Sequence, residues 1–202
     1  MEIFVLSLMF AVVGYTLKSR AEGRRIALLG LHLGNYQIEK LMETLTDGYA
    51  RALGENDAAR RGSIWQLMNG TEEKLAAQFK QLADSMAKVD AAETGVNLWP
   101  WPLSEAAPWA PSACFDLRKA LKIHADGLAR AADHSNDISP SSRAFTLSAE
   151  LFLMQHTCHW FCKSKTIASA RMLVRHQTTY EMVLQSVSPE TRQAYSALVG
   201  QA

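Results

Sequence analysis

The stretch from Ile3 to Leu17, IFVLSLMFAVVGYTL, contains no charged residue and determines how the rest of the chain is interpreted. As one helix it would span about 22 Å, which is less than the roughly 30 Å hydrocarbon core of a bilayer. Long basic side chains at its end can reach the headgroups, so a short helix still spans at modest cost. The basic residues that flank this stretch are Lys18, Arg20, Arg24 and Arg25. We therefore expect residues 1–18 to form a single-pass membrane anchor.

Two other interpretations of this stretch stay open. A cleaved secretory signal has a basic start and a small-residue cleavage site, whereas this chain begins Met1-Glu2 and has no A-x-A pattern before the basic residues. A helix in a soluble core normally carries a polar stripe, and only Ser7, Gly14 and Thr16 interrupt the apolar residues. Both comparisons favour an uncleaved signal-anchor helix.

The position of the basic residues also predicts an orientation. They lie on the carboxyl side of the apolar stretch, so the positive-inside rule places the N-terminus outside and the helical domain in the cytoplasm. The cysteines, Cys114, Cys158 and Cys162, are an odd and sparse set that cannot form a disulfide framework. A reducing compartment agrees with that orientation.

Composition excludes several classes of protein. The 202 residues are 48% hydrophobic and 20% charged, which is typical of one globular domain with an appendage and not of a disordered or polytopic membrane protein. Lysine and arginine number 21 against 20 acidic residues, a net charge of +1. We therefore expect no nucleic-acid partner.

Helical periodicity dominates the remaining sequence and predicts an all-α fold, with a bundle of about five or six helices behind the membrane helix. A long amphipathic helix is expected to continue from the anchor and to end at Gly54. The residues of its polar face are Arg25, His32, Tyr36, Glu39, Glu43 and Asp47. A short helix over 57–68, a break at Asn69-Gly70 and a helix over 71–93 would complete the first helical part of the bundle, residues 19–93.

A crossover rich in tryptophan and proline is expected over residues 94–112, because repeated X-Pro steps exclude a helix there. Its tryptophans, Trp99, Trp101 and Trp109, are candidate interaction residues. They can pack over the bundle, sit in a membrane headgroup zone, or dock into a groove of a partner protein.

The second helical part covers residues 113–202. A helix is expected from a cap at Ser112 to about Ala132, and a central helix over about 140–186 that starts at Ser139-Pro140. Ser188-Pro189-Glu190 starts a final short helix, and no alternating run is long enough to predict a strand.

The segment from Ala144 to Cys162 has one charge in nineteen residues and resembles a second membrane span. Glu150 and the histidines of that segment would be costly in lipid, whereas a central bundle helix is apolar on most sides. We therefore expect it to be the core helix of the bundle.

The one local cluster with chemical content is His156, Cys158, His159 and Cys162, which share adjacent turns of that helix. It predicts, as an alternative, a site for zinc or another transition metal, a haem or a redox function. The remaining ligands would come from Cys114, His124, His32 or His176. The simpler interpretation is that the cysteines pack in the core as small apolar residues and that the histidines hydrogen-bond within the bundle.

No catalytic motif accompanies these features. Glu39 and Glu43 lie one turn apart, but no Glu-x-x-His motif of a di-iron bundle is present, nor any phosphate loop or nucleophile elbow. The sequence therefore favours a non-enzymatic interaction or accessory component of a membrane assembly, with the lipid bilayer and a protein as its partners and no resident cofactor. The alternative is the metal-, haem- or redox-responsive module.

Overall fold

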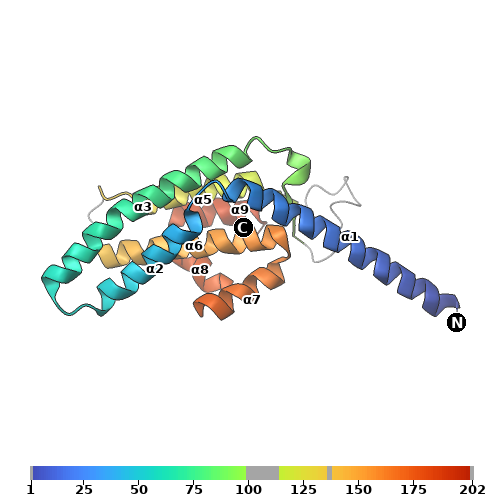
Figure 1. Ribbon diagram of the computed structural model, residues 1–202, viewed down its shortest axis with the longest axis horizontal. Coiled ribbons are helices and arrows are strands. Elements are labelled where there is room, and N and C mark those ends of the chain that lie inside the picture. Colours follow the sequence, from blue (N-terminus) through green and yellow to red (C-terminus); the bar gives the residue numbers. More distant parts are fainter. Residues whose placement is uncertain (1, 99–113, 136–137, 201–202) are drawn as a thin grey trace.

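The computed structural model describes residues 2–98, 114–135 and 138–200. Within these residues the chain forms eight α-helices, one 3₁₀ turn and a two-stranded sheet (Figure 1). The all-α expectation is therefore confirmed. The predicted contact residues Trp99, Trp101 and Trp109 lie outside the described residues.

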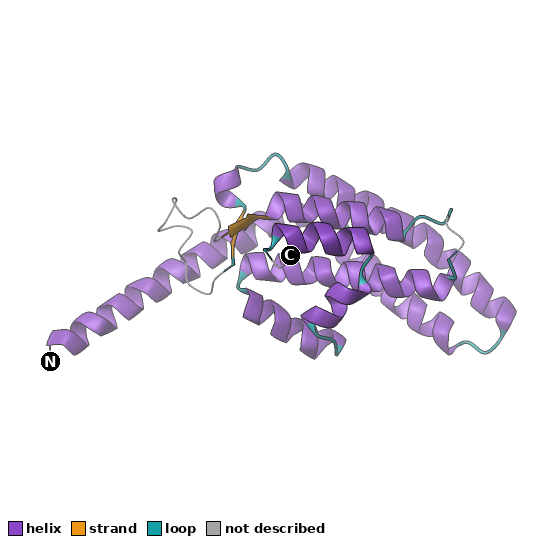
Figure 2. Ribbon diagram, turned by 180° about the vertical axis from the view of Figure 1, so that it is seen from behind, coloured by secondary structure: helices purple, strands orange, loops and turns teal. Residues whose placement is uncertain are grey.

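Helix α1, Glu2–Leu33, has two sections with different surroundings. Its first half projects from the bundle, and its second half lies against the bundle (Figures 1 and 2). Leu29 is buried, and His32 Nδ1 lies 2.7 Å from Ser85 Oγ of α3. One continuous helix thus joins the apolar stretch to the folded domain.

The expected long helix is interrupted after Leu33, and α2 occupies Ile38–Gly54. The predicted end at Gly54 is confirmed, but the predicted continuity is wrong. Gly34 N–H donates to Gly30 O, and the Asn35 side chain donates to Leu31 O, so the Gly-Asn pair satisfies the last carbonyls of α1.

Helix α3, Ala58–Met86, runs through the predicted break at Asn69-Gly70. Gly70 is exposed, so it costs the helix some stability without ending it. Asn69 Oδ1 instead accepts a hydrogen bond from Arg143. The predicted helix to residue 93 ends earlier, and a separate 3₁₀ turn follows at Ala91–Glu93.

A small antiparallel sheet replaces the start of the predicted helix after Ser112. Strand β1, Gly95–Asn97, pairs with β2, Cys114–Asp116, in the register Val96 to Phe115. Helix α5, Leu117–Ala131, begins only after β2, because Asp116 caps it by accepting from the backbone N–H of Arg118. The sheet lies at the end of the bundle from which α1 emerges (Figure 2).

The predicted central helix over 140–186 is three helices: α6, Pro140–Cys162; α7, Lys165–His176; and α8, Tyr180–Ser186. Its predicted start is confirmed, since the Ser139 side chain accepts from Ser142 N–H. The breaks were missed because the sequence between Lys163 and Val187 has neither glycine nor proline. Side-chain caps at Ser164 and Thr179 mark them instead.

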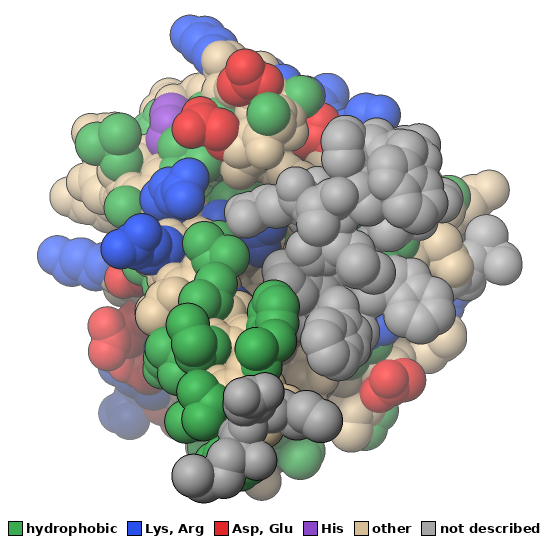
Figure 3. Space-filling model, turned by 90° about the vertical axis from the view of Figure 1, so that its right-hand side faces the viewer, with side chains coloured by type: hydrophobic (Ala, Val, Ile, Leu, Met, Phe, Trp, Pro, Cys, Tyr) green, Lys and Arg blue, Asp and Glu red, His purple; other side chains and the backbone are tan. Residues whose placement is uncertain are grey.

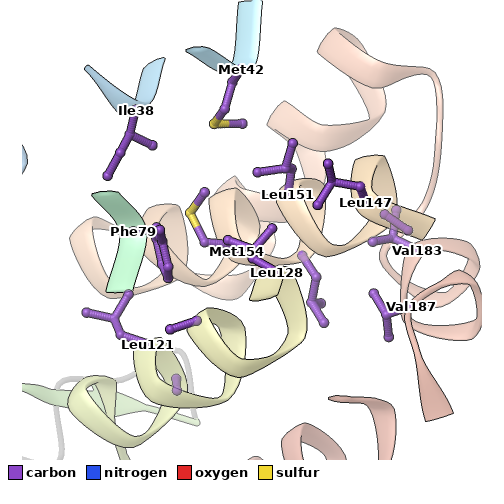
Figure 4. Close-up of a cluster of buried hydrophobic side chains, with 14 of the residues drawn as sticks. Ile38, Met42, Phe79, Leu121, Leu128, Leu147, Leu151, Met154, Val183 and Val187 are labelled. Carbon is purple, nitrogen blue, oxygen red and sulfur yellow. The ribbon is translucent and has the colours of Figure 1, made fainter. Parts of the chain in front are cut away.

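Helix α9, Pro189–Leu198, starts at the predicted Ser-Pro signal and closes the bundle. Helix α6 is the central element and packs against α1, α2, α5, α7 and α8. Figure 4 shows the apolar cluster around it, where Met154 of α6 meets Phe79 of α3 and Leu128 of α5. The expectation that residues 144–162 form a core helix is confirmed.

A close approach between helices in this core gives a stability prediction. A Cβ at Gly127 of α5 would lie 2.5 Å from both Glu150 Oε2 and Thr191 Oγ1. We expect Gly127→Ala to lower the free energy of unfolding by about 1–3 kcal/mol, as overpacking does. Gly62→Ala in α3 is the control, since its Cβ meets nothing within 4 Å and the helix should gain about 0.5–1 kcal/mol. Chemical denaturation of the full chain in mild detergent measures both; stabilisation by Gly127→Ala would contradict this packing.

Candidate functional site

The first half of α1 carries an apolar surface that the other described residues do not cover. Its large apolar side chains are between 51% and 74% exposed and lie on all sides of the helix. They are Phe4, Val5, Leu6, Leu8, Met9, Phe10, Val12, Val13, Tyr15 and Leu17. The helix is the one candidate membrane span among the described residues, and none of its apolar window is buried.

The predicted membrane-flanking residues lie where α1 joins the bundle. Lys18, Arg20 and Arg24 are exposed, whereas the Arg25 guanidinium lies 5.8 Å from the centre of the Phe161 ring of α6. Glu22 accepts a hydrogen bond of 2.6 Å from Lys163 Nζ, just after α6. These contacts attach α1 to the bundle close to the point where it emerges.

The carboxylates of the predicted polar face line a groove of about 590 Å³ between α2, α6 and α7. Glu39, Glu43 and Asp47 lie along the α2 wall. The opposite wall was not predicted, and its residues are Ser148, Leu151, Phe152, Gln155, Arg175 and His176. No sequence signal marks this wall, because its residues lie about a hundred positions from α2 and share no motif.

Ordered contacts hold the far wall of this groove. The His176 ring stacks on Phe152 with a centroid distance of 3.8 Å, and its Nε2 lies 2.9 Å from Gln155 Oε1. Arg175 is exposed beside them. The groove thus offers three carboxylates and the Lys40 ammonium on the α2 side, a basic group on the other side, and apolar surface from Leu45 and Leu151 between them.

The His/Cys cluster of α6 is spread over separate contacts. His156 Nε2 lies 3.0 Å from Ser169 Oγ, and His159 Nδ1 lies 3.1 Å from Arg171 Nη1. Burial raises the pKa of the Cys158 thiol to about 12 and also raises that of Cys162, which disfavours the thiolate that metals and electrophiles require.

The other proposed ligands point to separate partners. Cys114 Sγ donates to Asn97 Oδ1, His32 bonds Ser85, and His176 bonds Gln155. Among the described residues, no group of three or more His, Cys, Asp or Glu side chains is placed to hold a metal ion. The described geometry therefore gives the metal-site alternative no support.

A buried polar network crosses the core at Thr157. Its hydroxyl donates to Leu153 O, so it accepts from Tyr195 OH and from His124 Nε2–H, both at 2.9 Å. The Nδ1 atom of His124 then carries no proton, and it has no partner among the described residues. Burial lowers the pKa of His124 to about 3.

Two further buried acids connect helices. Nothing in the sequence indicated this structural role. Glu72 of α3 accepts from Tyr49 OH at 2.7 Å and pairs with Arg143. Glu150 of α6 accepts from the backbone N–H and hydroxyl of Ser188, at the start of α9, and burial raises its pKa. These groups have structural roles, and they leave the α1 surface and the groove as the candidate functional features.

Comparison with known proteins gives no further assignment. The chain matches no protein-family model, and neither the curated proteins nor the solved structures contain a match. Function is therefore inferred from the sequence and the geometry.

The two buried histidines predict a pH-dependent stability. Burial lowers the pKa of His124 and of His156 from about 6.5 to about 3. Below about pH 6.5 these histidines bind protons in the unfolded chain but not in the folded chain. Their contribution to the free energy of unfolding is therefore complete above that pH and is lost as the pH falls toward 3. Each histidine contributes a slope of up to about 1.4 kcal/mol per pH unit. Denaturation series should show a shallower slope for His156→Gln than for the wild type; equal slopes would contradict the assignment.

Proposed function

We propose that the protein is a membrane-anchored, non-enzymatic interaction or accessory component of a membrane assembly. The observation that carries the anchor is the set of ten large apolar side chains on all sides of the free half of α1. A helix that is apolar all round needs lipid or complete burial, and the bundle provides no burial for it. Lipid covers all sides of a single helix at once, which a flat protein surface does not.

The proposed orientation places the bundle in the cytoplasm and the N-terminus outside. Lys18, Arg20, Arg24 and Arg25 follow the apolar section on its carboxyl side. Basic residues next to a span are retained on the cytoplasmic side. The half-buried cysteines are compatible with that reducing compartment.

The proposed contact with a protein partner is the groove between α2, α6 and α7. The α2 wall offers three carboxylates and one lysine, Lys40, and is therefore net negative. The other wall offers Arg175 and a ring stack, with apolar surface between the two walls. Such a groove matches an amphipathic segment that carries basic groups along one edge. The anchor would hold this groove close to other proteins of the same membrane.

The anchor predicts resistance to alkaline carbonate extraction. Met9→Lys/Val13→Lys should release the protein into the soluble fraction, because each central lysine costs a membrane helix about 2.5–3.5 kcal/mol. Leu53→Lys/Leu67→Lys is the matched control, since these two side chains are at least as exposed as Met9 and Val13 but lie on the bundle. Wild-type protein in the soluble fraction, or release by both variants alike, would refute the anchor.

The orientation predicts protection of the bundle in intact cells. A cysteine at the exposed Ala59 of α3 should react with a membrane-impermeant maleimide only after lysis. An added cysteine is needed because Cys158 and Cys162 are half-buried and their raised pKa slows the reaction. Labelling of Ala59→Cys in intact cells, above the wild-type background, would reverse the orientation.

The groove predicts a partner that depends on its charge. Full-length tagged protein, purified from its own membranes in mild detergent, should carry a stoichiometric membrane protein, which Glu43→Lys removes. Asp84→Lys is the control, because Asp84 is an equally exposed helical carboxylate outside the groove. A partner that both variants retain would exclude the groove, and recovery of the wild type alone would count against the interaction function.

A further inference from the structure

We propose that a basic surface at the junction of α1, α6 and α7 binds anionic phospholipid headgroups in the leaflet that α1 enters; this rests on the proposed anchor. We call it the junction surface. Its basic residues are Lys18, Arg20, Arg24, Arg25, Lys163, Lys165 and Arg171. The sequence alone did not connect the four residues of α1 with the three that follow α6.

The height of this surface above the bilayer follows from α1. The apolar section ends at Leu17, and Arg24 lies seven residues further along the same helix, which is about 10 Å at 1.5 Å per residue. A headgroup layer extends roughly 5–8 Å beyond the hydrocarbon core. Lys18 to Arg25 therefore cross the headgroup layer or lie within a Debye length of it, about 8 Å at physiological salt.

The corner between α6 and α7 lies at the same height, because it contacts this section of α1. Lys163 Nζ lies 2.6 Å from Glu22 Oε2, and Arg25 lies over the ring of Phe161. Figure 3 looks at the molecule from the free end of α1, and basic side chains lie beside its apolar residues on one side.

The cations of this corner are fixed in position. Lys165 Nζ lies 4.6 Å from the centre of the Tyr180 ring and 5.2 Å from that of Trp160. Arg171 lies against His159. A positioned cation loses less side-chain entropy when it binds a phosphate than a free one does.

Positive charge predominates at the junction surface. Two acids act directly on these cations: Glu22, which pairs with Lys163, and Glu181, whose charge acts on Lys165. Together with these two acids, the seven basic residues carry a formal charge of +5, whereas the whole chain carries +1. An anionic leaflet attracts this positively charged surface.

The residues available for headgroups are those that no acid already neutralises. Among the described residues, the ion pairs involve neither Arg20, Arg24 nor Arg171, and all three are exposed. Guanidinium groups bind phosphate with two parallel hydrogen bonds, and the phosphate of an anionic headgroup, unlike that of phosphatidylcholine, has no choline cation to balance its charge.

The test measures which lipids surround the full-length protein. The protein is reconstituted in phosphatidylcholine vesicles that contain a trace of spin-labelled phosphatidylglycerol or, separately, of spin-labelled phosphatidylcholine. Electron paramagnetic resonance then gives the motionally restricted fraction of each. We expect the relative association constant of phosphatidylglycerol to exceed that of phosphatidylcholine by about threefold or more, and the ratio to fall toward one at high salt.

Two matched variants locate the effect. Arg20→Gln/Arg24→Gln/Arg171→Gln should bring the ratio close to one while the protein still floats with the vesicles. Arg51→Gln/Arg60→Gln/Arg61→Gln removes the same charge at the far end of α2 and α3 and should leave the ratio unchanged.

The outcomes separate this inference from the anchor on which it rests. A restricted lipid fraction with no preference for phosphatidylglycerol, or an equal loss of preference in both variants, overturns the junction surface and leaves the anchor standing. Protein that neither floats with vesicles nor restricts any lipid overturns both.

Discussion

The position of the whole bundle depends on one helix, α1, which packs against the bundle with its second half and leaves it with its first half. The second half of α1 contributes Leu29 to the core and attaches to α6 through the Glu22–Lys163 ion pair. The first half leaves the bundle with its apolar side chains uncovered. Because the helix is continuous between them, whatever covers the first half also sets the position of the whole bundle.

The other features can be placed relative to the point where α1 leaves the bundle. The junction surface belongs to the end of the bundle from which α1 emerges (Figure 1). The groove between α2, α6 and α7 is lined by residues further along those helices. Buried polar interactions fix the helices relative to one another. Glu72 of α3 forms an ion pair with α6, and Thr157 of α6 forms hydrogen bonds to α5 and α9. Breaking one partner of such a link leaves a buried polar group unsatisfied, so these links favour a single arrangement of the helices.

The elements that the sequence predicted well are those with a strong local signal. The apolar run before Lys18, the Ser-Pro helix starts at Ser139 and Ser188, and the end at Gly54 each depend on neighbouring residues alone. The Gly-Asn pair that ends α1 was a local signal too, but the amphipathic pattern on both sides of it concealed it. At Asn69-Gly70 the sequence predicted a break that the fold does not have, because this turn signal lies inside α3. Glu72, just after it, is a buried acid on the apolar face of the helix, and hydrogen bonds from Tyr49 and Arg143 compensate its burial.

The candidate sites were less predictable, for a physical reason. The α2 wall of the groove was visible as a polar helix face, whereas its other wall depends on how α6 and α7 pack. The His/Cys cluster looked like a ligand set because four such residues lie within two turns. In the fold, His156 turns to α7 and Cys158 to Met154, so adjacency in sequence does not bring them together.

The measurement that tests the central claim most directly is a spin-label scan along α1 of the full chain in lipid vesicles, with the native cysteines replaced by alanine. Labels at Val5, Met9 and Val13 should collide more often with oxygen, which concentrates in lipid, than with a water-soluble nickel chelate. Labels at the exposed Ile26 and Leu31 should show the reverse. A label at Met9 that the nickel chelate reaches as freely as it reaches Leu31 would contradict the account, because the free half of α1 would then lie in water.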